Sequence, residues 1–287
     1  MPPKVYFSKA ITPNELVRLY GMLGAKLSGR VAVKVHSGEV GNQNFLRPEF
    51  FRPIIESVGG TVVECNTAYE GGRDTTEKHI KTFKLHGWVP SFEVDLLDAE
   101  GPDLELEIPN GREIKKCFVG KDIVNYDSAL VLSHFKGHPM GGYGGALKQL
   151  SIGFASSYGK KYIHGVGDTV DYWNSDHDSF LRAMADAASA VVNFFDRRIV
   201  YINVMKNLSV DCDCCAVAED PCMPDIGVLA STDPVAIDRA CLDLVYASSE
   251  KGRDHLVKRI ETRNGTLTPV AAASLGIGSL EYELVEV

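Results

Sequence analysis

The chain repeats one pattern in Val31-Ala32-Val33-Lys34-Val35-His36 and in Ala129-Leu130-Val131-Leu132-Ser133-His134. Each run is almost continuously apolar, ends in a histidine and leads into a segment that contains glycine. A third apolar run spans residues 199–204. Runs of this length and composition are typical of strands that helices cover on both faces of a parallel sheet.

Shorter β-branched runs alternate with helical patterns along the rest of the chain. This alternation predicts an α/β fold, with a largely parallel or mixed sheet flanked by helices. We expect a single domain over residues 1–287, which can divide into lobes 1–125 and 126–287 around a cleft. The remaining predicted strands are 5–8, 61–65, 92–97, 104–108, 226–230 and 282–285.

The ends of several helices and one hairpin can also be predicted. A capping residue followed by proline is typical of a helix start, and a glycine of a helix end. The expected features are a helix from Thr12-Pro13 through Leu27, a long helix capped by Ser175 and closed by Arg197 and Arg198, helix starts at Asp233-Pro234 and Thr268-Pro269, a stop at Gly276, and a hairpin over residues 93–116 with its turn at Pro109-Asn110-Gly111.

Composition and charge exclude several classes of protein. The 287 residues are 45% apolar and 24% charged, which excludes intrinsic disorder, and the formal net charge of -8 opposes nucleic acid and anionic membranes as partners. The first residues lack the pattern of a signal peptide, and no apolar run is long enough to span a bilayer. We therefore expect a cytoplasmic protein whose thiols are reduced, with neither nucleic acid nor a membrane as partner.

A glycine-rich segment follows the second apolar run, His134-Phe135-Lys136-Gly137-His138-Pro139-Met140-Gly141-Gly142-Tyr143-Gly144-Gly145-Ala146-Leu147-Lys148. Because ligands bind beyond the carboxyl ends of strands in open α/β sheets, this segment is a predicted site. A helix that starts near Gly145 would point unpaired N–H groups at a bound anion. We expect Gly141, Gly142, Gly144 and Gly145 to contact the ligand.

The basic and imidazole side chains of this segment are candidates for catalysis. His134, Lys136, His138 and Lys148 occur together with the glycines, and Lys148 stands in the first helical turn, where a cation opposes the helix dipole. The competing interpretation is a flexible surface turn with a solvated lysine. The glycine spacing matches neither a phosphate loop nor a dinucleotide-binding motif, so no nucleotide is implied.

The first apolar run leads into a second candidate segment, Val35-His36-Ser37-Gly38-Glu39-Val40-Gly41-Asn42-Gln43-Asn44. His36 at the strand end, with Glu39 as a base, would polarise or deprotonate a small substrate. The alternative is a histidine that closes the turn through hydrogen bonds.

Four of the seven cysteines fall within 11 residues, as Cys212, Cys214, Cys215 and Cys222. Thiolates among the neighbouring aspartates would repel one another, and a bound cation or iron–sulfur cluster removes that conflict. The spacing matches neither structural zinc sites nor ferredoxins, so three of these ligands plus a fourth from elsewhere is one arrangement. The competing interpretation is a mobile acidic loop with free thiols.

The other cysteines and histidines are not predicted to carry chemistry. Cys65, Cys117 and Cys241 stand at strand-like or helical core positions and are expected to be buried. Five histidines stand among polar neighbours and are expected to be solvated, namely His79, His86, His164, His177 and His255.

The segments described above, together with residues 225–238, resemble the motifs of a known family, the domain of unknown function 362. The resemblance implies fold relatives that are often labelled iron–sulfur centre proteins. Longer members carry a ferredoxin insert after the glycine–lysine segment, but residues 154–178 of this chain contain no cysteine, so a 4Fe–4S centre would depend on the Cys212–Cys222 loop. The matching motifs, in the family's order, are residues 36–42, 134–148, Asp211-Cys212-Asp213-Cys214 and residues 225–238.

A second, local resemblance concerns residues 138–148, which are similar to a motif of the nickel-pincer lactate racemase family. In that family the lysine anchors the cofactor, and the histidine takes part in metal ligation and proton transfer. The resemblance implies such roles for Lys148 and His138.

These observations lead to one functional hypothesis and two alternatives. The leading hypothesis is a metal- or iron–sulfur-dependent enzyme, such as an oxidoreductase, that acts on a small anionic molecule. The first alternative is a non-catalytic electron-transfer or metal-handling module that docks on a redox partner protein. The second is a racemase-like enzyme that transfers a proton without net redox change.

Overall fold

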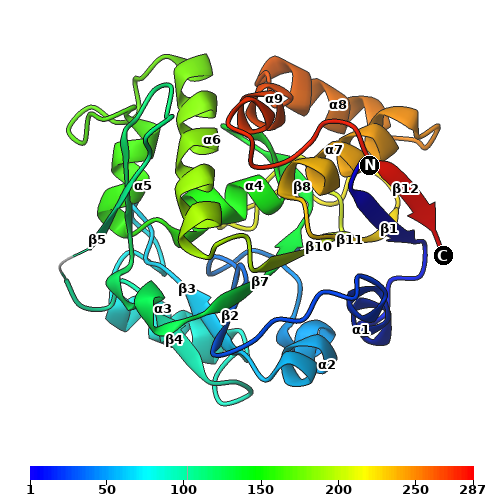
Figure 1. Ribbon diagram of the computed structural model, residues 1–287, viewed down its shortest axis with the longest axis horizontal. Coiled ribbons are helices and arrows are strands. Elements are labelled where there is room, and N and C mark those ends of the chain that lie inside the picture. Colours follow the sequence, from blue (N-terminus) through cyan, green and yellow to red (C-terminus); the bar gives the residue numbers. More distant parts are fainter. Residues whose placement is uncertain (102) are drawn as a thin grey trace.

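The computed structural model describes residues 1–101 and 103–287 and has one main sheet with helices on both faces (Figure 1). Seven of its eight strands run in one direction, and β11 runs in the opposite one. The sheet is thus mixed and largely parallel, which confirms the predicted α/β class. Its strands in spatial order are β12 (Glu283–Glu286), β1 (Lys4–Ser8), β11 (Gly227–Ser231), β10 (Ile199–Met205), β7 (Ser128–His134), β2 (Val31–Lys34), β3 (Thr61–Glu64) and β4 (Val94–Leu96).

The helices form a layer on each side of this sheet. In Figure 1 the first two helices lie below the sheet, and the helices from residue 146 onward lie above it. The strands of both proposed lobes belong to the same sheet, and the division into lobes stays a prediction. The helices are α1 (Pro13–Met22), α2 (Pro48–Val58), α3 (Thr76–Leu85), α4 (Ala146–Lys148), α5 (Ser157–His164), α6 (His177–Phe194), α7 (Pro234–Ala247), α8 (Arg253–Thr262) and α9 (Leu267–Ser274), with a 3-10 helix, η1 (Lys121–Asn125), and a π-helix, η2 (Gln149–Gly153).

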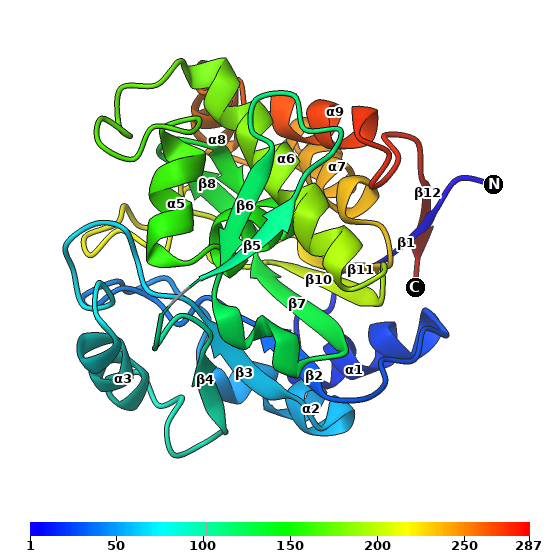
Figure 2. The ribbon, with the colours of Figure 1, turned by 60° about the vertical axis from the view of Figure 1, so that its left-hand side comes forward.

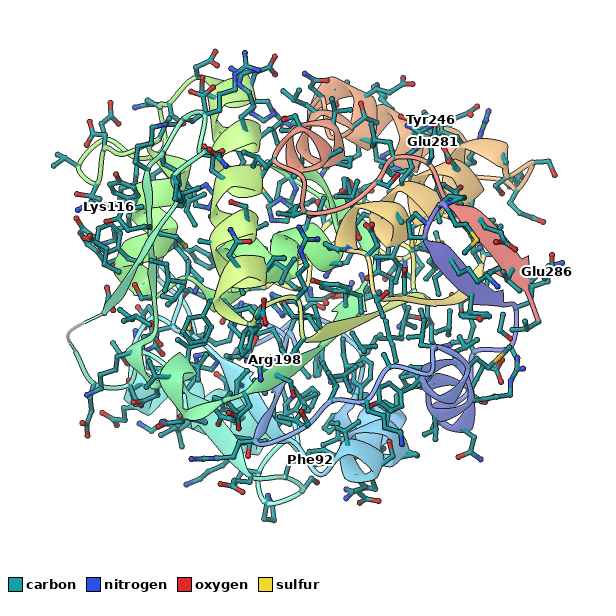
Figure 3. All side chains as sticks on the ribbon, in the orientation of Figure 1. Phe92, Lys116, Arg198, Tyr246, Glu281 and Glu286 are labelled. Carbon is teal, nitrogen blue, oxygen red and sulfur yellow. The ribbon has the colours of Figure 1, made fainter. Side chains whose placement is uncertain are left out.

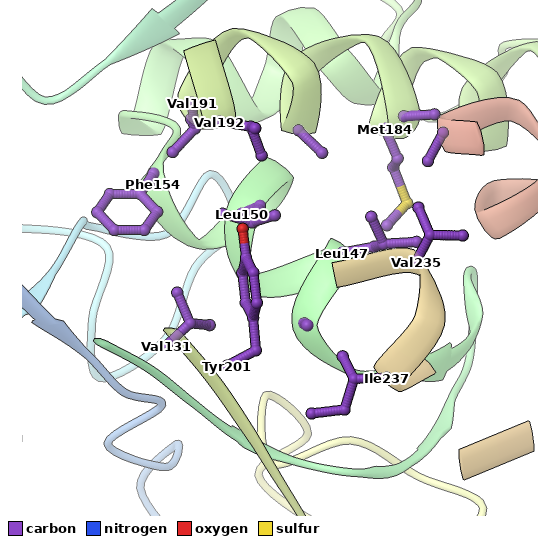
Figure 4. Close-up of a cluster of buried hydrophobic side chains, with 14 of the residues drawn as sticks. Val131, Leu147, Leu150, Phe154, Met184, Val191, Val192, Tyr201, Val235 and Ile237 are labelled. Atoms are coloured by element: carbon purple, nitrogen blue, oxygen red, sulfur yellow. The ribbon is translucent and has the colours of Figure 1, made fainter. Parts of the chain in front are cut away.

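The apolar runs are continuous because the central strands are buried on both faces. Along β7, Ala129 and Val131 face one hydrophobic core, and Leu130 and Leu132 face the other. Figure 4 shows the first core, in which Val131 lies below side chains of α4, η2 and α6. Alternate residues of a strand point to opposite faces, so a strand between two helical layers needs apolar residues at every position.

The surface has the opposite composition. Figure 3 shows charged side chains around the periphery, with Lys116 and Glu286 at opposite sides of the molecule. Lys116 pairs with Glu105, and Glu286 pairs with Lys9, in ion pairs that are about half exposed. Within the described ranges, no helix has both the length and the apolar character that crossing a membrane requires.

Two helix starts are confirmed and two are corrected. The Thr12 side chain accepts a hydrogen bond from the Glu15 N–H, and Asp233 caps α7 in the same way. The long helix α6 is capped by Asp176 and not by Ser175, whose hydroxyl donates to the His164 carbonyl. The last helix, α9, begins at Leu267, so Thr268 and Pro269 lie inside its first turn, where proline needs no N–H partner.

The predicted ends of helices were less accurate than their starts. The first helix ends at Met22 and not at Leu27, because Gly24 adopts a left-handed conformation just after it. The long helix ends at Phe194, before Arg197. Gly276 has a φ of +73° and follows the end of α9, as predicted.

The predicted hairpin is shorter than residues 93–116. The first strand within the predicted range, β4, does not belong to the hairpin and pairs with β3 at the edge of the main sheet. The hairpin consists of β5 (Leu104–Glu107) and β6 (Lys116–Val119), and β6 packs beside α5 (Figure 2). The predicted turn residues 109–111 do lie between these two strands.

Candidate metal centre and cavity

The candidate site lies at the carboxyl ends of β2, β3, β7 and β10. His134 is the last residue of β7, and His36 follows β2 by two residues. The two strands are paired in parallel, with Lys34 opposite Val131. Parallel neighbours end at the same edge of a sheet, so both strand-end histidines reach the same region, as predicted.

His134 and Lys136 clamp a carboxylate of the cysteine loop (residues 211–222). His134 Nδ1 lies 2.9 Å and Lys136 Nζ 3.0 Å from the Asp213 carboxylate, and all three side chains are buried. Burial alone would raise the pKa of Asp213, but the adjacent His134 ring and the Lys136 ammonium hold it well below its usual range. Neither His134 nor Lys136 lines the cavity described below, and their catalytic roles stay predictions.

The segment after β2 also supports the cysteine loop. The Asn42 amide donates to the Cys215 carbonyl at 2.8 Å, and the Asn44 amide donates to the Glu219 carbonyl at 2.7 Å. Glu39, a predicted base, is buried and accepts hydrogen bonds from Arg73 Nε at 3.2 Å and from a backbone N–H. This segment therefore positions the cysteines, and the Glu39 carboxylate lies outside the cavity lining.

One imidazole and two thiols meet beside this loop. The ligand atoms of His138, Cys212 and Cys214 all lie within 4.8 Å of one another. His138 ends β8 (Lys136–His138), which pairs with β9 (Gly142–Gly144), and its Nε2 lies 3.8 Å from Cys214 Sγ. These residues form a candidate metal site, which we call the His–Cys–Cys group.

The Lys148 ammonium stabilises a thiolate in this group. Lys148 Nζ lies 3.3 Å from Cys212 Sγ, which is fully buried. Burial works to raise the pKa of Cys212, but the hydrogen bond from Cys214 and the charges of Lys136 and Lys148 lower it well below its usual value. The same hydrogen bond raises the pKa of Cys214. These opposite shifts favour the thiolate form at Cys212 and the thiol form at Cys214.

The other two clustered cysteines lie outside the group. Cys215 is half-buried, and its sulfur does not join the ligand atoms that the described residues bring together. Cys222 donates from Sγ to the Leu208 carbonyl at 3.2 Å. Cys65, Cys117 and Cys241 are buried in the core, as predicted.

The expectation that the helix starting near Gly145 points unpaired N–H groups at a ligand is wrong for its first two residues. The N–H groups of Ala146 and Leu147 donate to the Asp238 carboxylate of α7 at 2.8 and 3.0 Å. A buried carboxylate of the protein itself therefore caps α4. Burial raises the pKa of this Asp238 carboxyl to about 6, against the effect of the donors around it.

The four loop glycines permit close packing within the protein. A Cβ on Gly145 would lie 2.5 Å from Asp238 Oδ1, and one on Gly142 would lie 2.8 Å from the backbone of Gly265. Gly141 lies beside the His138 ring, and Gly144 lies beside the side chains of Lys136 and Lys148. A ligand-binding role for these glycines stays a prediction.

Replacing Gly145 with alanine is expected to lower the free energy of unfolding by about 1–3 kcal/mol, because the short Asp238 side chain cannot move away without losing the cap. Urea unfolding of Gly145→Ala measures this change. The matched control is Gly21→Ala in α1, where a Cβ meets nothing within 4 Å. This control should be stabilising by up to about 1 kcal/mol. Equal stability of the two variants would contradict the packing argument.

A cavity of about 240 Å³ opens beside the His–Cys–Cys group. His138, Cys214, Lys148 and His36 all line it, so the structure brings together these predicted site residues. Its other polar or aromatic lining residues are Lys34, Glu64, Cys65, Thr67, Tyr69, Arg73, Gln149, Lys160, His164, Trp173 and Phe180, and its aliphatic ones include Ala68, Pro139, Met140, Ile152 and Met184.

The charge of the lining is predominantly positive. Among the described residues, the lining contains one carboxylate, Glu64, and four basic side chains, which are Lys34, Arg73, Lys148 and Lys160. Burial lowers the pKa of Lys34 to about 8, although Glu64 at 3.8 Å opposes this shift. Within a low-dielectric cavity, such an excess of cations favours an anionic ligand.

Two histidines expected to be solvated are buried. His79 is fully buried and lies 3.0 Å from Glu64 and 3.2 Å from Asn66. His164 is 8% exposed, stacks on Phe180 and lines the cavity, and burial lowers the pKa of its ring to about 3. Sequence reasoning missed both because their neighbours along the chain are polar. One signal in the sequence could have indicated His164: it follows Lys160 by four residues, so both side chains lie on the same face of a helix.

The chain matches the family described as Domain of unknown function (DUF362) over residues 31–243, which is more than half of its length. It belongs to this family. The match confirms the family resemblance of the sequence, and the motifs at residues 36–42, 134–148 and 211–214 fall inside the matched segment. No curated protein matches the chain in a sequence comparison.

Two solved structures are similar to this DUF362 protein. One is the lactate racemase apoprotein from Thermoanaerobacterium thermosaccharolyticum, at 15% identity and a TM-score of 0.42, over 69% of this chain and 50% of that one. The other is a protein from Thermotoga maritima, at 9% identity and a TM-score of 0.43, over 91% of this chain and 58% of that one. The chain thus spans about half the length of these structures.

Proposed function

We propose that this DUF362 protein is a metal-dependent enzyme that acts on a small organic anion. The observation that carries the proposal is the His–Cys–Cys group at the wall of a positively charged cavity. Because His138 and Cys214 line the cavity, an ion at this group would be accessible to a ligand there. A catalytic metal site has few protein ligands and an open position, whereas a structural site is closed.

The donor set fits a single soft-binding transition metal ion. Two sulfurs and one imidazole suit zinc, nickel, copper or iron. A 4Fe–4S cluster takes four thiolates, and Cys222 is engaged with the Leu208 carbonyl. When bound, the ion would supply a Lewis acid that polarises an oxygen of the ligand or lowers the pKa of a bound water.

The chain's own residues would bind the anion and hold protons near it. The excess of lysine and arginine in the cavity lining supports an anionic substrate. Lys34 Nζ donates to Gln149 Oε1 at 3.0 Å, and its pKa of about 8 lets this amine exchange a proton close to neutral pH. The Lys148 ammonium would hold Cys212 as the thiolate that a metal ion requires.

One observation favours a second function, that of a metal-free redox dithiol. His138 Nδ1 accepts a hydrogen bond from the Gly141 N–H at 2.9 Å, so the neutral ring carries its proton on Nε2, the atom that a metal ion would take. The Cys212 thiolate and the Cys214 thiol would then form a disulfide, passing two electrons to a redox partner protein and releasing the one thiol proton of Cys214. The cavity beside the thiols has no role in this alternative, and for this reason we favour the enzyme.

Elemental analysis of protein purified without air tests the proposal. We expect about one transition metal ion per chain, since two thiolates and one imidazole bind such ions tightly. Addition of Co²⁺ to chelator-treated protein should also produce thiolate-to-metal charge-transfer absorption. If the protein contains no iron, zinc, nickel or copper, and if its absorption does not change when Co²⁺ is added, the metal proposal is wrong. A reversible dithiol oxidation in the same sample would support the alternative.

A further inference from the structure

The Lys160 ammonium is a buried charge without a carboxylate partner. Its side chain is 6% exposed, and Nζ donates to the Ala155 carbonyl at 2.6 Å. In the described part of the chain, no carboxylate oxygen lies within 4.0 Å of this nitrogen. Since the Ala155 carbonyl is the acceptor that Nζ has among the described residues, two of its three N–H bonds have no acceptor there. A buried ammonium in this state is costly, and its position in the first turn of α5 adds an unfavourable helix dipole.

The other cations near the cavity are compensated. Arg73 pairs with Glu39 at 3.2 Å, and Lys136 pairs with Asp213 at 3.0 Å. Lys34 has Gln149 and Glu64 beside it, and Lys148 has the Cys212 sulfur. Lys160 is thus the lining cation whose charge the described residues leave available to a ligand.

A second polar group without a partner lies one helical turn from Lys160. His164 Nδ1 is buried and has no hydrogen-bond partner in the described part of the chain. The ring is held between Phe180, at a centroid distance of 4.6 Å, and Trp173, at 4.9 Å, so its orientation is fixed by packing. Both side chains line the cavity. An unsatisfied buried nitrogen is destabilising, and a ligand in the cavity would satisfy it.

We propose that Lys160 and His164 form the headgroup subsite of the cavity and bind the carboxylate of a small organic acid. This inference rests on the proposed function, since it names the class of the anion. The Lys160 ammonium pairs with the carboxylate, and His164 makes a hydrogen bond to the same headgroup through Nδ1. The apolar body of the acid packs on Met140, Ile152 and Met184.

The geometry favours a carboxylic acid over an inorganic anion. Part of the cavity wall is aliphatic. Met184 Sδ and the His138 ring both lie beside Gly141, so the aliphatic part of the wall lies next to His138. An acid whose carboxylate binds Lys160 would lie along this wall, and its apolar part would approach the His–Cys–Cys group. A free phosphate would leave this wall uncovered and would bring more charge than one unpaired ammonium compensates.

Binding of benzoate and butyrate, each compared with its neutral amide, tests the subsite. Calorimetry or NMR titration of the full chain should show that each carboxylate binds about tenfold or more tightly than benzamide or butyramide, because only the acid forms an ion pair with Lys160. Inorganic phosphate should bind more weakly than benzoate. If neither acid binds more tightly than its amide, or if phosphate binds more tightly than both acids, the inference is overturned.

The variant Lys160→Met should lose this preference for the acids. It is expected to fold and to be at least as stable as the original chain, because it removes an uncompensated buried charge. The matched control is Lys161→Met, which removes the same charge from the next residue of α5, outside the cavity lining. His164→Phe keeps the stacked ring and should weaken benzoate binding several-fold. Unchanged benzoate affinity in both Lys160→Met and His164→Phe would contradict the inference.

The titrations are done on chelator-treated and on metal-loaded protein. Carboxylate binding that depends on Lys160 without any bound metal would support the subsite even if the metal proposal failed. Stoichiometric metal without carboxylate preference would leave the metal centre supported and overturn the subsite.

Discussion

Protein in which Cys212 is replaced by serine is expected to contain little or no bound transition metal. A buried serine hydroxyl is a poor ligand for soft metal ions, whereas Cys212 is held as a thiolate by Lys148 at 3.3 Å. We expect the affinity for Zn²⁺ or Co²⁺ to fall more than about 100-fold, since even the loss of a residue that only supports a ligand costs roughly 10–100-fold. Competition with a chromophoric chelator measures the change.

The matched control is Cys222→Ser in the same loop. Cys222 contacts the Leu208 carbonyl and lies outside the His–Cys–Cys group, so this variant should keep its metal. His138→Ala should lose metal as Cys212→Ser does. If Cys222→Ser and Cys212→Ser lost metal equally, Cys222 would also be needed for binding, which would contradict the His–Cys–Cys group and favour an iron–sulfur cluster.

The variant Asp213→Ala is expected to lower the free energy of unfolding by about 3–5 kcal/mol, because it leaves the buried Lys136 ammonium and the buried His134 ring without their carboxylate partner. The carboxylate is 1% exposed and lies within 3.0 Å of both. Urea unfolding at pH 7 measures the loss. The control is Asp211→Ala, which breaks a partly exposed pair with Arg259 and should cost no more than about 1 kcal/mol. Similar losses in both variants would refute the clamp.

The pH dependence of stability gives a second test of the clamp. The pKa of Asp213 is lower in the folded chain than in the unfolded chain, so the unfolded chain binds a proton first as the pH falls. The stabilisation by Asp213 is therefore fully present above the ordinary aspartate value of about 3.9 and is lost as the pH falls below it toward the folded value. Stability should fall less steeply with acid in Asp213→Ala than in the original chain.

The fold class was predictable because it depends on local patterns. Continuous apolar runs at residues 31–35 and 129–132 indicated strands buried on both faces, and the structure places them side by side in the sheet. The edge of the sheet that carries His36 and His134 followed from the same patterns, since parallel strands end together. Helix starts followed from capping residues such as Thr12 and Asp233, which act on N–H groups two or three residues away.

The sequence also indicated part of the candidate site. The clustered cysteines and the His138–Lys148 segment were singled out separately, and the structure brings Cys212, Cys214, His138 and Lys148 together. Which cysteines join the group was not predictable from spacing, because Cys215 is nearer to Cys214 along the chain than Cys212 is and still lies outside the group.

The tertiary structure alone decided which charged groups are neutralised and which remain available. Asp213 and His134 are 79 residues apart, and Asp238 caps a helix whose first residues are more than 90 positions away. Such partners are set by the packing of strands and helices, and they place carboxylates of the protein itself beside His134 and at the start of α4. Lys160 and His164 show the converse. Among the described residues the Lys160 ammonium has no carboxylate partner and His164 Nδ1 has no hydrogen-bond partner, and on this ground we propose them as the place for a ligand.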